Sequence, residues 1–150
     1  MREILFRGKR TDNGEWVEGS LIVLDADSGY YFITESYESA STLPVKDLIY
    51  NHTHLVDPET VCQFTGLTDK NGVKIFEGDV VSTDIKRPYF IIEFRDGCFM
   101  CNCNDGGDDY YDIMLPIHKE PHENYEYGAV IGNIFDNPEL MEGGGSDDCD

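Results

Sequence analysis

The sequence predicts a mostly β protein built from short hairpins that form a small barrel or sandwich. Short runs of aromatic and β-branched residues are separated by turns that contain Gly, Asn or Asp. Many short strands with closely spaced turn signals are typical of barrels and sandwiches. In addition, nowhere do apolar residues recur at i, i+3, i+4 and i+7 over three turns, as a long amphipathic helix requires.

Two hairpins are predicted around Asn13-Gly14 and Asn71-Gly72. Asn and Gly both tolerate the positive φ of a type I′ turn, and the twist of that turn matches the twist of its flanking strands. The Asn-Gly step therefore predicts a type I′ hairpin at each place. The flanking strands are expected over residues 4–10, 15–24, 61–67 and 73–83.

The remaining elements follow from alternation and from turn residues. Residues 30–35 alternate as a strand, whereas VKDLIY (45–50) suits either a helical turn or a strand. Asp57-Pro58 then ends this segment, because Pro restricts the residue before it to extended geometry. A tight turn at Asp96-Gly97 predicts a third hairpin. Strands in this half are expected over residues 88–94, 98–103, 110–117 and 127–135.

The elements group into an N-terminal hairpin region (1–60), a barrel-like region (61–138) and an acidic tail (139–150), although residues 1–138 could also form one compact unit. We expect the tail to be disordered, because its Gly run and clustered acids bury too little apolar surface to offset ordering entropy. In the C-terminal half, IFEGDVV (75–81) followed by a hairpin is similar to the opening of an SH3-like barrel.

One sequence pattern occurs twice, 58 residues apart. The four shared features, in chain order, are Phe6 and Phe64, Gly8 and Gly66, Asn13-Gly14 and Asn71-Gly72, and, after one inserted residue, Glu18-Gly19 and Glu77-Gly78. We interpret the repeat structurally: two hairpins need the same turn chemistry and the same bulge-forming Gly. The alternative is that each copy contributes to a symmetric binding site.

The sequence resembles the YopX-like proteins of phages and prophages. The resemblance lies in four segments: REILFRGKRTDNGEWVEGSLI (2–22), DPETVCQFTGLTDKNGVKIFEGDVV (57–81), IEFRDGCF (92–99) and AVIGNIFDNPEL (129–140). One departure is Cys62, where Gly is the commoner residue in that family. The resemblance implies a small, mostly β protein that is prone to self-association and has no established activity, and it assigns no catalytic residue.

The charge of the chain limits its partners. Its 150 residues carry a formal net charge of -19, from 11 basic and 30 acidic residues. Binding to nucleic acid depends on Lys and Arg contacts with phosphates, so direct nucleic-acid binding is not expected. No apolar run is long enough to cross a membrane, and MREILFRGKR (1–10) lacks the long apolar core typical of a signal peptide. We therefore expect a cytoplasmic protein whose five cysteines are free thiols.

Two groups of residues have the composition of a metal site. Cys98, Cys101, His118 and His122 follow a Cys2His2 spacing. However, an odd separation on a strand directs Cys98 and Cys101 to opposite faces, whereas Cys101 and Cys103 share one. His52 and His54 would share a strand face, with Asp57 as a third ligand. In both groups, packing or surface roles are more common, so we predict no metal and no cofactor.

No other pattern indicates chemistry. The loop Asn102 to Asp112 has the composition of a calcium loop but lacks the EF-hand spacing. The motifs of hydrolases and of phosphate-binding loops are absent.

We therefore expect a noncatalytic binding protein that forms a homo-oligomer or meets a host or phage protein. Aromatic residues are expected to form its core or its subunit contacts: Phe6, Trp16, Phe64 and Phe76. The alternative is an acidic nucleic-acid mimic that occupies the basic groove of a host protein.

Overall fold

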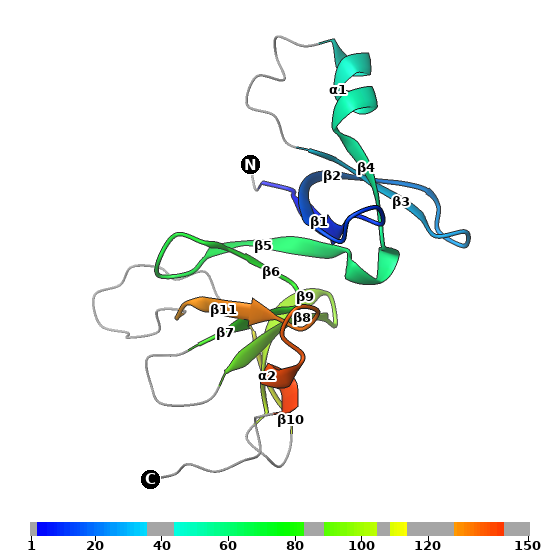
Figure 1. Ribbon diagram of the computed structural model, residues 1–150. Helices are drawn as coiled ribbons and strands as arrows, with labels where there is room; N and C mark the ends of the chain where they lie inside the picture. The colour runs from blue at the N-terminus through cyan, green and yellow to red at the C-terminus, as the bar shows by residue number, and fades with distance from the viewer. Residues whose placement is uncertain (1–2, 36–43, 83–88, 105–108, 114–127, 143–150) are drawn as a thin grey trace. The chain divides into compact units, whose positions relative to one another are not determined.

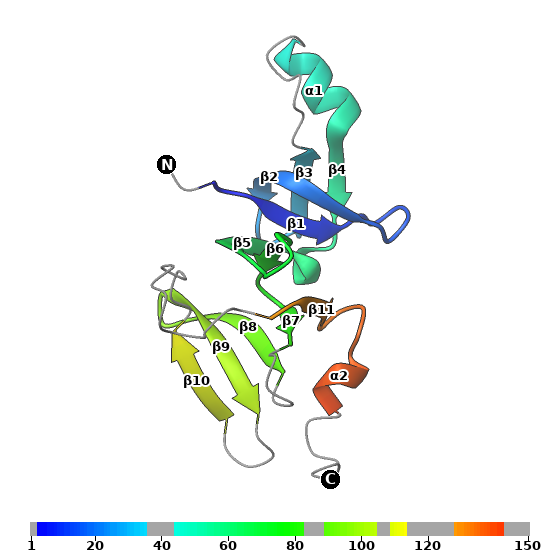
Figure 2. The ribbon, with the colours of Figure 1, turned by 90° about the vertical axis from the view of Figure 1, so that its left-hand side faces the viewer.

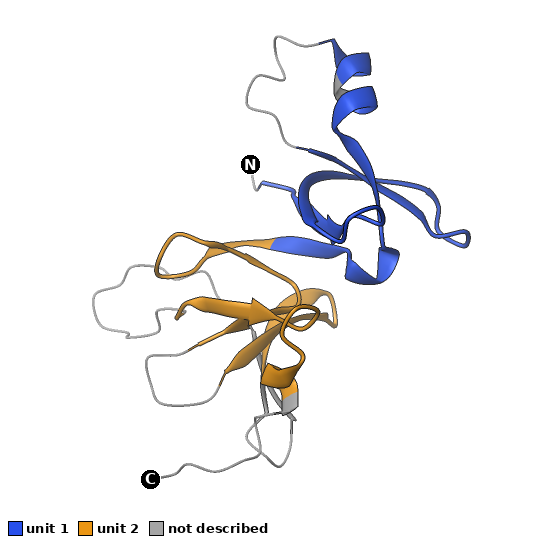
Figure 3. Ribbon diagram, in the orientation of Figure 1, with its two compact units in different colours: residues 1–64 blue, residues 65–150 orange. Residues whose placement is uncertain are grey.

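The computed structural model describes residues 3–35, 44–82, 89–104, 109–113 and 128–142. The chain divides into two compact units, residues 1–64 and 65–150 (Figure 3). Nearly all of the described elements are β-strands, which pair into two sheets (Figure 1). The predicted mostly β class is therefore confirmed, while the closer prediction of a barrel or sandwich stays a prediction.

Among its described residues, the first unit contains four complete strands, the start of a fifth and two short helices. Figure 2 shows these elements. The strand order of the first sheet is β4-β3-β2-β1-β5-β6, and β5 runs from the first unit into the second. The elements from the start of the first unit to the end of β5 are β1 (Phe6–Lys9), β2 (Trp16–Asp25), β3 (Tyr30–Glu35), α1 (Val45–His52), β4 (Thr53–Val56), the 3-10 helix η2 (Pro58–Thr60) and β5 (Cys62–Thr68).

The core of the first unit lies on one face of this sheet. Val17, Ile33 and Val56 are buried there, on β2, β3 and β4. Half-buried apolar side chains pack against them, namely Phe6, Leu21, Tyr31 and Val61. Because successive side chains of a strand point to opposite faces, the residues between these core positions belong to the other face.

The end of β1 also bonds to β4. The N–H of Thr11 donates to the carbonyl of Leu55 (3.0 Å), and the N–H of Asp57 donates to the carbonyl of Lys9 (2.8 Å). Arg10 and Val56 form an antiparallel bridge between these two bonds. The second edge of β4 is therefore partly occupied by backbone hydrogen bonds within the unit.

The second unit contains the second sheet, whose order is β10-β9-β8-β7-β11. Its core cluster comprises Ile75, Val81, Ile92 and Cys101. Among the described residues, no helix is long and apolar enough to span a membrane. The elements that follow β5 are β6 (Lys74–Phe76), β7 (Asp79–Val81), β8 (Phe90–Arg95), β9 (Cys98–Asn104), β10 (Asp109–Ile113), β11 (Val130–Asn133) and α2 (Glu139–Glu142).

The Asn-Gly turns have the predicted position but not the predicted type. Gly14 and Gly72 have positive φ (72° and 79°), whereas neither Asn13 nor Asn71 does, so neither turn is type I′. The reason is loop length. Backbone bonds join Arg10 to Glu15 and Asp69 to Val73, leaving loops of four and three residues rather than two. The type I′ turn is found at Asp96-Gly97, where both residues have positive φ (53° and 84°).

The two copies of the repeated sequence pattern are structurally equivalent only in part. Its two turn glycines have the same conformation, but the later glycines serve different needs. Gly78 has a φ of 82°, whereas a Cβ on Gly19 would lie 1.8 Å from the carbonyl oxygen of Thr34. One glycine permits a left-handed backbone and the other permits close approach of β3. The expectation of one shared bulge-forming glycine is therefore wrong at this pair.

Two sequence expectations about element type are also resolved. VKDLIY, for which helix and strand were both open, lies within α1. One strand was expected over residues 73–83, but the described part of this range contains two, β6 and β7. The strand breaks at Gly78, because the buried carboxylate of Asp79 turns back to accept the N–H of Phe76 (2.8 Å).

Candidate functional site

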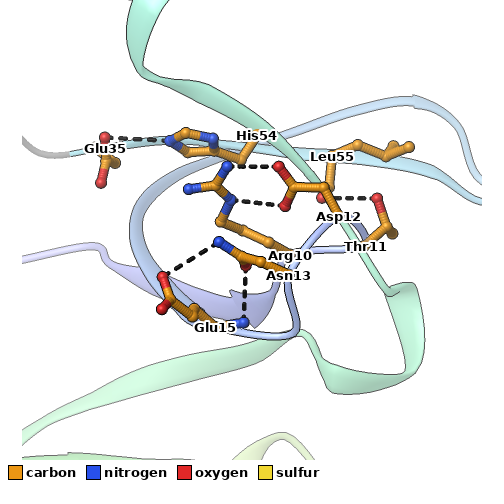
Figure 4. Close-up of polar contacts among 8 residues, drawn as sticks. All are labelled: Arg10, Thr11, Asp12, Asn13, Glu15, Glu35, His54 and Leu55. Carbon is orange, nitrogen blue, oxygen red and sulfur yellow. Dashed lines mark hydrogen bonds and ion pairs between the residues drawn. The ribbon is translucent and has the colours of Figure 1, made fainter.

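The imidazole cluster, which we define as Glu35, His52 and His54, brings three elements of the first unit together. Glu35 ends β3, His52 ends α1 and His54 lies in β4. Antiparallel pairing sets Thr34 opposite Thr53 and so directs Glu35 toward the two histidines. Glu35 Oε2 lies 3.4 Å from His52 Nδ1 and 3.2 Å from His54 Nε2. Figure 4 shows Glu35 and His54 facing each other.

The cluster is electrostatically asymmetric. The Glu35 side chain is 44% exposed and the His54 side chain 17%. The contact with His54 is the main reason that the pKa of Glu35 lies below its ordinary value, and His52 contributes further. His54 Nε2 is itself shielded from solvent and has no well-aligned hydrogen bond. The contact is therefore an ion pair whose strength depends on the charge of the imidazole.

A second ion pair lies in the turn between β1 and β2 (Figure 4). Arg10 donates to both oxygens of Asp12, from Nε to Oδ1 (2.9 Å) and from Nη2 to Oδ2 (2.6 Å). These bonds raise the pKa of Arg10 and lower the pKa of Asp12. The negative charge of Glu35 also acts on Arg10, so this pair belongs to the electrostatic surroundings of the imidazole cluster.

The cluster changes the set of residues that sequence reasoning grouped together. His52 and His54 do face the same partner, but that partner is Glu35 and not Asp57. Asp57 caps η2, where its Oδ1 accepts the N–H of Glu59 (3.0 Å). In the part of the chain that the structure describes, no group of three or more His, Cys, Asp or Glu side chains is suited to hold a metal ion.

The cysteine and histidine group is only partly within the described residues. Cys98 is half-buried, whereas Cys101 is 6% exposed and belongs to the core of the second unit. The two side chains thus differ in surroundings, as their odd spacing on β9 predicts. Cys103 lies in β9, and His118 and His122 lie outside the described residues. The loop Asn102 to Asp112 also lies partly outside them.

The four aromatic residues singled out from the sequence have different surroundings. Phe76 and Phe64 are core residues, 1% and 4% exposed. Phe6 is half-buried and packs against the core of the first unit. Trp16 is half-buried, and two cations lie over its ring, with Arg7 Cζ 4.8 Å and Lys9 Nζ 5.3 Å from the ring centroid. Three of the four therefore serve packing within the chain, and Trp16 is held by cation–π contacts.

An apolar row lies on the face of the first sheet opposite the core. We define it as Ile22, Phe32 and Leu55, which sit side by side on β2, β3 and β4. Leu55 is 37% exposed, and Tyr30, two positions before Phe32, is 53% exposed. The sequence did carry a signal for this face: LIVL (21–24) is a continuous apolar run, which indicates apolar side chains on both faces of a strand.

A hydroxyl row borders the apolar row. It consists of Ser20, Thr34 and Thr53, again paired across β2, β3 and β4. The hydroxyls of Thr34 and Thr53 are hydrogen-bonded to each other at 2.8 Å. None of the six residues in the two rows is charged, although the chain as a whole carries a net charge of -19.

Comparison with known proteins finds a matching family and a similar solved structure. The family described as "YopX protein" matches residues 5–142 of the chain. A similar solved structure is the crystal structure of protein EF1440 from Enterococcus faecalis, with 25% sequence identity and a TM-score of 0.50. The match covers 94% of this chain and 99% of that one. No curated protein matches the chain. The chain therefore belongs to the YopX protein family.

Proposed function

We propose that this protein is a noncatalytic binding protein that assembles with copies of itself through the apolar row. The observation that carries the proposal is the side-by-side arrangement of Ile22, Phe32 and Leu55 on the face that the core does not use. Apolar side chains that share an exposed face are typical of interaction sites, because removing them from water stabilises a complex.

The lack of charge in the apolar and hydroxyl rows favours a second copy of the chain as the partner. Two chains that each carry a net charge of -19 repel each other, so they meet best where neither presents a carboxylate. The apolar and hydroxyl rows together provide such a surface. A basic partner would instead be expected to select an acidic face. A two-fold arrangement would place the same rows of both copies against each other.

The proposed contact uses a sheet face and not a sheet edge. An unpaired sheet edge is another route to self-association, since it can recruit another strand. In the first unit, however, the bonds from Lys9 and Thr11 already occupy part of the outer edge of β4. Face-to-face packing of apolar side chains is therefore the route that we propose for the first unit.

The size of the patch sets the expected strength. A stable interface of standard size uses about 20 to 30 residues on each side, far more than the apolar row and Tyr30 supply. We therefore expect a weak, concentration-dependent dimer with a dissociation constant on the order of 10 µM or higher. The apolar row would form the centre of the contact.

The alternative, an acidic nucleic-acid mimic, is less well supported. A mimic should display carboxylates in rigid rows. Several carboxylates of this chain instead serve its own structure: Asp12 pairs with Arg10, Asp57 caps η2, and Asp69 and Asp79 accept backbone N–H groups. We further propose that the protein belongs to a phage or prophage, acts in the cytoplasm, and meets host or phage proteins rather than nucleic acid.

The test is sedimentation velocity of the full chain from low to high micromolar concentration. Leu55→Asp places a charge within the apolar row, next to Phe32, and should leave the chain monomeric where the wild type associates. Ile131→Asp is the matched control, because Ile131 also lies on a strand and is 40% exposed, but in the second unit. A wild type that stays monomeric throughout, or equal association of wild type and Leu55→Asp, would refute the proposal.

A further inference from the structure

We propose that protonation of His52 holds α1 against the sheet of the first unit, so that the imidazole cluster is a pH-sensitive latch. The latch closes when the imidazole is charged and opens when it is neutral. This inference concerns α1 and its contacts with β3 and β4, and it does not depend on the proposed self-assembly.

The helix is weak by itself. It has eight residues, and its N-cap position is Pro44, which supplies no side-chain capping bond. Isolated helices shorter than about 12 residues are marginal in water even when their composition is favourable. The sequence VKDLIYNH is also poor in strong helix formers, since Val, Ile, Asp, Asn and His all have low propensity. The helix therefore needs tertiary contacts.

Burial of its described apolar side chains does not supply enough of them. Val45 is 69% exposed, Ile49 is 49% exposed and Tyr50 is 84% exposed. Stabilisation by apolar side chains scales with the area that they remove from water, so these three contribute little. Among the described side chains of α1, a polar contact to the sheet therefore has more influence than these three apolar side chains.

His52 makes that polar contact at the end of the helix where charge matters most. It lies in the last turn of α1, where a cation is favoured by the helix dipole. Its Nδ1 also lies 3.4 Å from Glu35 Oε2 on β3. Both effects require a charged imidazole, and both fade when the imidazole loses its proton. Two independent electrostatic terms thus couple the helix to the same protonation event.

The charged groups around His52 favour this behaviour. Glu35 contacts it from β3, and His54 on β4 contacts the same Glu35 oxygen. Arg10 and Asp12 form a self-compensating pair in the turn between β1 and β2. On α1 itself, Asp47 lies in the first turn, at the opposite end from His52. Among the described residues, Glu35 is thus the anion that acts most directly on the imidazole.

The direction of the pH effect follows from these groups. A free imidazole loses its proton near pH 6.5. The pKa of Glu35 lies below its ordinary value of 4.5, so the carboxylate is still charged in the weakly acidic range. The two states are therefore compared at pH 5.5 and pH 8, on either side of the ordinary range of an imidazole.

The test uses NMR secondary chemical shifts of residues 45–52 in the full chain at pH 5.5 and pH 8. An exposed ion pair and a helix-end charge each contribute modestly, so we expect the unwound fraction of α1 to rise about fivefold between the two conditions. The shifts of β2 and β3 report whether the sheet is intact. Shifts of α1 that do not change with pH would overturn the proposal.

Variants separate the latch from a general effect of pH. His52→Gln should give α1 the pH 8 behaviour of the wild type at both pH values, and Glu35→Gln should reduce the pH response. Asp12→Asn is the matched control, because it removes a nearby exposed carboxylate that does not contact His52, and its pH response should equal that of the wild type. A wild-type pH response in His52→Gln would refute the latch.

Discussion

Replacing Gly19 with alanine is expected to destabilise the first unit by about 3 kcal/mol. The added Cβ would lie 1.8 Å from the carbonyl oxygen of Thr34 and 2.9 Å from the Cα of Glu35. Ordinary contact begins at 3.4 Å, so β2 and β3 would have to separate by about 1.6 Å at this point. Backbone hydrogen bonds do not survive such a displacement. Losing about three of them at roughly 1 kcal/mol each gives the stated cost.

The assay is urea unfolding of the full chain followed by the fluorescence of Trp16. This is the only tryptophan of the protein, and it lies on β2, three residues before Gly19. With a slope of about 2 kcal/mol per molar urea, the midpoint should fall by about 1.5 M without a change in slope.

Gly14→Ala is the matched control. Gly14 also has a special backbone conformation, with a φ of 72°, but no atom lies within 4 Å of the position that a Cβ would occupy. Its substitution should therefore cost only the strain of a left-handed alanine, about 1 to 2 kcal/mol. If Gly19→Ala costs no more than Gly14→Ala, close approach of β3 is not the reason for Gly19.

Two further predictions concern the second unit. Asp69 is buried, which alone would raise its pKa, but the N–H groups of Val130, Val73 and Asn71 outweigh burial and lower it. Asp69→Ala should cost about 3 kcal/mol in urea unfolding. In the wild type, the contribution of the Asp69 carboxylate to the free energy of unfolding is complete above its ordinary pKa of 3.8. It is lost as the pH falls through the lower pKa of the folded state. If stability depends on acidic pH in the same way with and without the substitution, this reasoning is contradicted. Native mass spectrometry with added zinc should show no adduct that depends on Cys98, because Cys101 is buried in the core. A stoichiometric adduct lost in Cys98→Ser would contradict this second prediction.

Local sequence signals were sufficient where a few neighbouring residues set the structure. Asp96-Gly97 follows Arg95 and precedes Cys98, which form the last bonded pair of the hairpin, so only a two-residue turn fits. The Asn-Gly steps marked turns correctly but did not determine turn type, because the last bonded pair lies farther along the strands. Turn type depends on strand register, and a dipeptide does not encode register.

The candidate sites were less predictable, because their residues meet through pairing of distant strands. His52 and His54 stood out as neighbours in the sequence, but their partner Glu35 is brought to them by the register of β3 and β4. Likewise, the apolar row combines one residue from each of three strands. In the sequence, only the apolar run around Ile22 indicates that both faces of β2 carry apolar side chains.

The sequence by itself determined the mostly β class, the positions of the hairpin turns, the acidic character and the resemblance to the YopX family. These properties follow from composition, from alternation and from the backbone preferences of Gly, Asn and Asp, all of which act within a few residues. The tertiary structure decided that residues 45–52 are a helix, that Gly19 permits close packing whereas Gly78 permits a turn, and that Glu35 faces two histidines. Those outcomes depend on which strands pair and in which register, and strand pairing is set by burial over the whole unit.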